Sequence, residues 1–397
     1  MVSPVLPAAG KQFSAGLAAV LGCLQPAIDP VFLALASSAT GLRAEDHGWV
    51  VGATQAAAAL GALLVWWLGA DWQRIARGRA GQLAAALALL AALLTPLAAG
   101  LPWLLGLRAA YGLGMGAIYA SAMGAYAASL QERATKAYGV VLLGQLLMAT
   151  AVSPVLPILA EGLGADVALW CLAMVPALAL AAVSGMAPWA EAEPAHAQHA
   201  RTPLAGWALA LGTFWFICAT MMVWSLSGGL AMAAGLGHDL IGQAVSLGSL
   251  AGAATAWVVM RRSGRRERVP LVLQGLLAGM AVLSPLVLIG PEQGVGLITS
   301  MVLLNIGSTA IIILGSGLAS AAAKDSRFRV LVAATHNLGM TAGPALGSAL
   351  VWADPEHGIF IGAALSVGFA VLALTLAGVS RGLSPMRPYA IWRIGAR

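Results

Sequence analysis

The sequence predicts an all-helical membrane protein with twelve membrane-spanning helices, and three observations support this fold class. Of the 397 residues, 60% are hydrophobic and only 9% are charged, whereas an average soluble domain has about 25% charged residues. The apolar residues form long runs separated by polar connections, and the basic residues gather in every second connection. This composition excludes a soluble enzyme. The three cysteines all lie in apolar runs, which excludes a disulfide scaffold.

Each apolar run is long enough to cross a membrane as a helix, which requires about 20 residues. The runs do not alternate between polar and apolar residues, as the strands of an outer-membrane barrel would. The predicted spans are 13–38, 48–69, 80–99, 101–127, 137–158, 167–188, 205–228, 241–260, 269–290, 295–320, 329–352 and 358–380. Because the number of spans is even, both termini are expected on the same side of the membrane.

The distribution of basic residues predicts which side that is. With the N-terminus in the cytoplasm, nineteen of the 21 lysines and arginines fall in cytoplasmic segments, and Arg43 alone falls on the opposite side. Basic residues are typical of the cytoplasmic connections of membrane proteins. We therefore expect a multi-pass protein of the inner (plasma) membrane with both termini in the cytoplasm. The net charge of +6 then reflects topology, and no nucleic-acid partner is expected.

The second half of the chain repeats features of the first. An offset of about 190 residues aligns segment 61–66 with 252–257, the basic connection 74–79 with 261–268, and Ser153-Pro154 with Gly343-Pro344. We predict two six-helix halves, residues 1–188 and 205–397, joined by a polar cytoplasmic linker, 189–204. Parallel repeats of this kind are typical of transporters, in which the substrate site lies between the halves.

Three groups of residues resemble motifs of a known family. They are Arg108, Gly112 and Gly116 in the fourth span; Asp71, Arg74, Arg262, Gly264 and Arg265 in two basic connections; and Pro154, Gly343 and Pro344 in the fifth and eleventh spans. With twelve spans in two halves, the chain resembles the major facilitator superfamily of secondary transporters. The resemblance implies two pseudo-symmetric six-helix bundles around a central cavity, and gating roles for these residues. Two alternatives remain open: the glycines serve helix packing alone, and the basic residues serve membrane orientation alone.

Three ionisable residues lie inside predicted spans, where each costs at least about 2.5–3.5 kcal/mol at a helix centre. They are Asp29, Arg108 and His336. At 1.5 Å per residue, Asp29 and Arg108 lie roughly 14 and 10 Å from the outer ends of their spans, so we expect them to form a charge pair. We predict that these three residues couple transport to protons. The alternative is a static ion pair and a histidine packed in the core.

The predicted substrate wall is mostly apolar, with aromatic and methionine side chains and a few amides. Its candidate residues are Gln25, Tyr111, Met115, Tyr119, Gln145, Trp215, Met222, Asn305 and Met340. Such a wall suits a small amphipathic organic molecule. Contact with lipid or with the protein core is the alternative for each methionine and aromatic residue.

The sequence therefore predicts proton-coupled transport of a small organic molecule by alternating access, with export preferred over import. One alternative is an importer of a metabolite or siderophore. Another is a copper carrier, because Cys218 with Met222 and His336 with Met340 are pairs of soft ligands one helical turn apart. The sequence shows no nucleophile–base pair, metal triad or phosphate loop. We expect no enzymatic activity, cofactor or resident metal, and a monomer in the lipid bilayer.

Overall fold

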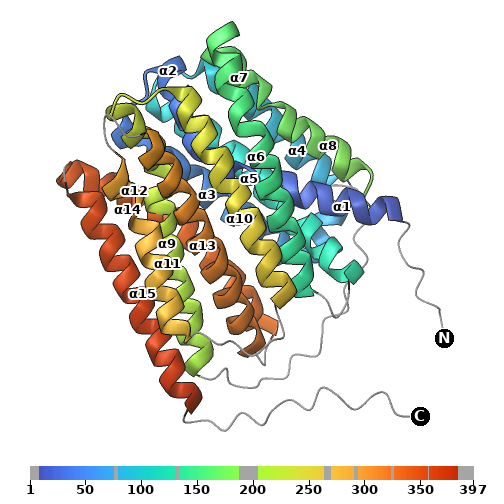
Figure 1. Ribbon diagram of the computed structural model, residues 1–397. Helices are drawn as coiled ribbons and strands as arrows, with labels where there is room; N and C mark the ends of the chain where they lie inside the picture. The colour runs from blue at the N-terminus through green and yellow to red at the C-terminus, as the bar shows by residue number, and fades with distance from the viewer. Residues whose placement is uncertain are drawn as a thin grey trace.

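The structure, a computed structural model, describes residues 9–75, 79–130, 134–186, 204–262, 270–289, 294–322, 326–355 and 357–382. Within these ranges the chain forms helices and connections and contains no strand. The elements are α1 (Ala9–Gly22), α2 (Gln25–Thr40), η1 (Ala44–Asp46), α3 (His47–Ile75), α4 (Ala80–Leu94), η2 (Thr95–Leu97), α5 (Leu101–Leu130), α6 (Ala134–Leu163), α7 (Ala165–Cys171), α8 (Met174–Ser184), α9 (Leu204–Ala233), α10 (His238–Arg262), α11 (Leu271–Leu283), α12 (Pro285–Leu288), α13 (Gly294–Ala322), α14 (Ser326–Ala353) and α15 (Gly358–Gly382) (Figure 1). The all-helical prediction is confirmed.

The helices fall at the positions of the predicted spans. Within the described ranges, nine segments are long and apolar enough to cross a membrane, and the bent pair α1–α2 is a tenth. The two remaining long helices, α5 and α14, have 30 and 28 residues. At 1.5 Å per residue each exceeds the roughly 30 Å of the hydrocarbon core. The protein is a multi-pass membrane protein.

Three of the predicted spans are divided into two helices in the structure. The first bends by 41° between α1 and α2. The sixth is divided into α7 and α8, and the ninth into α11 and α12. Pro26, Pro176 and Pro285 follow these breaks within the first turns of the new helices. Proline has no N–H to donate to the carbonyl four residues earlier, and its ring crowds that carbonyl.

The helices form two groups that lie side by side (Figure 1). In the first group α5 packs against α1, α3 and α4, and in the second α9 packs against α13, α14 and α15. The main contacts between the groups are those of α2 with α9, α3 with α14, and α6 with α10. Linker residues 189–203 lie outside the described ranges, and Leu204 begins α9. The exact boundaries of the two halves stay predictions.

Glycines allow the close approach of α5 to α3. A Cβ atom added at Gly112 would overlap the carbonyl oxygen of Thr54, and one added at Gly116 would overlap that of Ala58. Both neighbours are backbone atoms, so neither can turn away as a side chain could. The structure therefore favours the packing alternative for these two motif glycines.

Replacing Gly116 with alanine is expected to lower the free energy of unfolding by about 1–3 kcal/mol, because the added methyl group overpacks the α3–α5 contact. Gly106 on the same helix is the matched control, since a Cβ there meets no described atom within 4 Å. Gly106→Ala should leave stability unchanged or raise it by about 0.5–1 kcal/mol through helix propensity. Thermal unfolding of both purified variants in detergent makes the comparison. Equal melting temperatures for the two variants would contradict the packing role.

The two ends of the molecule differ in charge. We call the end that carries the described residues 41–47, 234–239, 354, 355 and 357 the acidic end, because Glu45, Asp46, Asp239 and Asp354 lie there. At the acidic end the two halves touch. Ser38 Oγ lies 2.9 Å from His238 Nε2, and Ser348 Oγ donates a hydrogen bond to the carbonyl oxygen of Glu45 at 2.7 Å. The acidic end is therefore closed in this structure.

Candidate functional site

Asp29 and Arg108 are both buried inside the first half, with exposed fractions of 2% and 3%. Asp29 lies in α2, just beyond the break that begins this helix, and Arg108 lies in α5. The first turn of α2 is largely buried, including Gln25 and Ile28. Both ionisable side chains are thus held in the membrane interior, as the sequence analysis expected.

Aromatic rings enclose the guanidinium of Arg108. Its Cζ atom lies 4.3 Å from the ring centre of Phe32 and 4.3 Å from that of Tyr111. Its Nε donates a hydrogen bond to Thr54 Oγ1 at 3.3 Å, and the hydroxyl of Thr54 itself donates to the carbonyl of Val50. Nη2 is buried without a hydrogen-bond partner among the described residues. Cation–π contacts in a desolvated site replace much of the hydration that the guanidinium loses.

Gln25 holds the carboxylate of Asp29. Its Nε2 donates a hydrogen bond to Asp29 Oδ1 at 2.8 Å, four residues along the same helix. Asp29 Oδ2 is buried and has no partner in the described part of the chain. No ion pair between Asp29 and Arg108 is present there either, so the predicted direct charge pair is wrong for this structure. Gln25 donates a hydrogen bond to the carboxylate of Asp29, and two aromatic rings flank the guanidinium of Arg108. The two charges therefore interact electrostatically at longer range, without direct contact.

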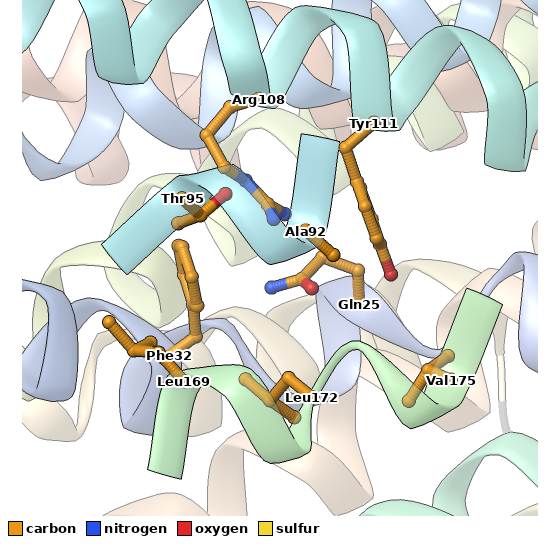
Figure 2. A pocket seen from close by; sticks show the side chains of 9 residues that line it. All are labelled: Gln25, Phe32, Ala92, Thr95, Arg108, Tyr111, Leu169, Leu172 and Val175. Carbon is orange, nitrogen blue, oxygen red and sulfur yellow. The ribbon is translucent and has the colours of Figure 1, made fainter. Parts of the chain in front are cut away.

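A small pocket lies beside these groups, inside the first bundle (Figure 2). Its lining residues are Gln25, Phe32, Ala92, Thr95, Arg108, Tyr111, Leu169, Leu172 and Val175, from α2, α4, η2, α5, α7 and α8. Figure 2 shows the guanidinium of Arg108 and the amide of Gln25 facing the pocket from opposite sides. Its volume of about 10 Å³ is enough for roughly one water molecule.

Several predicted substrate-wall residues lie near this region. Tyr111 lines the pocket, and Met115 is buried one turn further along α5. The oxygen of the Gln145 side chain accepts a weak hydrogen bond from Cys23 Sγ at 3.6 Å, beside the α1–α2 break. Tyr119 and Met340 are half-buried in α5 and α14. Substrate contact remains a prediction for these residues.

Three other substrate-wall residues lie inside the second bundle. The ring of Trp215 packs against Phe369 of α15, with centroids 5.1 Å apart. Met222 is fully buried, and its side chain contacts the positions of Gly347 and Gly362. Asn305 Nδ2 donates to the backbone within its own helix, α13. The face of α9 that carries Trp215 and Met222 therefore packs on α14 and α15, and this placement speaks against substrate contact.

A family model for the Major Facilitator Superfamily matches residues 13–331. The chain belongs to this superfamily. A solved structure of a bacterial homologue of the human lysosomal transporter Spinster, inward-facing and occupied, is similar to it, with a TM-score of 0.67 and 14% identity over 94% of this chain and 96% of that one. At this identity the likeness shows the fold. No curated protein sequence matches the chain significantly.

The superfamily fold, two pseudo-symmetric six-helix bundles around a central cavity, confirms the predicted fold class. Gly343 packs against the backbone of Cys218, and Pro344 lies against Gly48, so the glycine–proline motif of this superfamily member lies in helix contacts. The side chains of Asp71, Arg74, Arg262 and His336, and residues Gly264 and Arg265, lie outside the described part of the structure. Their gating and proton-coupling roles stay predictions.

Sequence reasoning missed several residues that this superfamily member places around Arg108. Phe32, Thr54 and Thr95 surround the guanidinium or its pocket. An aromatic residue three positions after Asp29 was a visible signal, because residues three apart share a helix face. The contribution of Thr54 from α3 had no such signal, since it depends on how the helices pack.

Proposed function

We propose that this superfamily member is a proton-coupled secondary transporter that carries a small amphipathic organic molecule across the inner membrane by alternating access, with export preferred over import. One observation supports the proposal above the others. A buried carboxyl group, hydrogen-bonded to Gln25, and a buried guanidinium lie in the interior of the first bundle, where Gln25 and Arg108 line a water-sized pocket. Two charges in this environment are costly and call for a functional reason.

The chemistry of the two groups assigns their roles. A guanidinium stays charged in proteins, whereas a carboxyl group can change its protonation state. Asp29 is therefore the group that would take up and release the proton. Arg108 would oppose proton uptake through its charge, and a water molecule in the pocket could carry the proton past Gln25. Each change of charge in a low-dielectric site shifts the balance between two conformations of the bundle.

The distribution of basic residues supports the proposed orientation, with both termini in the cytoplasm. The acidic end, where the two halves touch, then faces away from the cytoplasm. The copper alternative receives less support. Cys218 and Met222 are both fully buried and pack against the glycines of α14 and α15, which leaves their pair no open face for an ion. We propose a carrier rather than an enzyme.

The test is a proteoliposome assay with a pH-sensitive dye inside the vesicles and a panel of amphipathic organic molecules outside. A transported compound should move protons, and an imposed pH gradient should drive the compound against its own gradient. Transport of a compound that neither moves protons nor responds to the pH gradient would contradict proton coupling while leaving a transporter. Protein-free liposomes measure passive leak.

A further inference from the structure

Two prolines leave backbone carbonyls of the first half without an intrahelical partner. Pro30 in α2 has no N–H for the carbonyl of Pro26, and Pro154 in α6 has none for the carbonyl of Thr150. In a membrane interior such carbonyls must find other donors, because each unsatisfied backbone group there costs several kcal/mol.

Both carbonyls receive their donors from the second half of the chain. Trp224 Nε1 in α9 donates to the carbonyl oxygen of Pro26 at 2.7 Å. Ser246 Oγ in α10 donates to the carbonyl oxygen of Thr150, also at 2.7 Å. The first is short for an N–H···O bond, and the second has the usual length of an O–H···O bond. The same two helix pairs, α2 with α9 and α6 with α10, form much of the contact between the halves.

The helices are in direct contact at these bonds. One turn beyond Trp224, a Cβ atom added at Gly228 would lie 2.5 Å from the carbonyl oxygen of Pro30. On the other pair, a Cβ added at Gly242 would lie 2.6 Å from the carbonyl oxygen of Ser153. Trp224 and Ser246 lie nine and eight residues from the acidic ends of their helices, so the bonds are roughly 12–14 Å below that end. They lie within the closed contact and not at its rim.

We propose that Trp224 and Ser246 are positioning residues of the transport cycle, which hold the acidic end closed by hydrogen-bonding to the carbonyls that Pro30 and Pro154 leave free. The proposal rests on the alternating-access part of the proposed function. Opening the acidic end separates these helices, breaks both bonds and lets water reach the two carbonyls. The Trp224 bond also adjoins the proton site, because Pro26 follows Gln25, whose amide holds Asp29.

The experiment measures the conformational balance directly. Spin labels are placed at Glu161→Cys in α6 and Ala353→Cys in α14, two exposed positions at the acidic ends of opposite halves, after the three native cysteines are replaced. Distances between the labels are measured by pulsed electron paramagnetic resonance in lipid nanodiscs without substrate or a pH gradient. Trp224→Phe and Ser246→Ala should each raise the ratio of long to short distances by about two- to tenfold, the effect of losing one net hydrogen bond.

Matched controls come from bonds that lie within one half. Trp170 Nε1 donates to the carbonyl of Leu93 at 3.0 Å inside the first half, and Ser284 Oγ donates to the carbonyl of Ala281 at 2.7 Å inside the second. Trp170→Phe and Ser284→Ala should leave the distances unchanged.

Unchanged distances in both test variants, or equal shifts in test and control variants, would overturn the proposal. If Trp224→Phe does not fold, Ser246→Ala against Ser284→Ala still decides. The distance measurement uses no pH gradient, so it does not depend on proton coupling. If the distances shift as expected but the proteoliposome assay shows no proton-driven transport, only the proposal of proton coupling is contradicted.

Discussion

Replacing Asp29 with asparagine is expected to abolish proton-driven transport and to leave folding and membrane insertion intact. Asparagine has nearly the same shape as aspartate but cannot take up and release a proton. Its side-chain oxygen can still accept the hydrogen bond from Gln25 Nε2 that Asp29 Oδ1 accepts. Proton movement in proteoliposomes should fall to the rate of protein-free liposomes, while the purified variant is still folded and inserted in the membrane. Its melting temperature should be lower than that of the parent, because Arg108 loses the compensating charge of Asp29.

The chain offers a matched control for this change. Asp239 in α10, like Asp29, accepts a hydrogen bond from a glutamine on its own helix, in this case Gln243 Nε2, four residues later, at 2.8 Å. Unlike Asp29, Asp239 is exposed, at the acidic end. Asp239→Asn should transport as the parent does. Parental proton coupling in Asp29→Asn would remove Asp29 from the mechanism, and equal losses in both variants would point to a general effect of lost charge.

Replacing Arg108 with alanine is expected to destabilise the protein more than the double change Asp29→Asn with Arg108→Ala. The single change removes the guanidinium from between two rings and leaves the buried carboxyl group of Asp29 without a compensating charge. Removing one member of a buried charge pair typically costs about 3–5 kcal/mol of unfolding free energy. Because these two charges interact without direct contact, the loss should lie toward the lower end, at about 3 kcal/mol.

Melting temperatures of the parent, the two single variants and the double variant in detergent form the cycle for this prediction. Arg261→Ala serves as the control, because Arg261 is exposed and its Cζ atom lies 4.1 Å from the ring centre of Trp257. Exposed cation–π contacts contribute only about 0.5–1 kcal/mol, so this change should have little effect. Additive losses for Asp29 and Arg108 would show that the two charges do not interact.

The sequence predicted the helical segments well because a bilayer constrains them strongly. Apolar runs of the required length were visible along the whole chain, and glycines four residues apart indicated the close contact that Gly112 and Gly116 make with α3. The candidate site was predicted in part. Asp29 and Arg108 are buried as expected, but Gln25 and two aromatic rings take the contacts that a direct charge pair would have made. The sequence contained these residues without indicating which would reach the charges first.

The sequence by itself thus determined the order and approximate positions of the spans and the presence of two charged residues within them. In the bilayer core, where there is no water, the backbone must form its hydrogen bonds within helices. An ionisable residue inside an apolar span is easy to recognise in the sequence. Only the tertiary structure shows which neighbouring helix each face of a helix contacts. In α9 apolar residues occur on all sides, so helical periodicity could not show that Trp215 and Met222 face α14 and α15 while Trp224 faces α2. The rotation of α9 and α10 about their axes determines which side chains can donate hydrogen bonds to the carbonyls that Pro30 and Pro154 leave free. That rotation is set by the packing of the two halves.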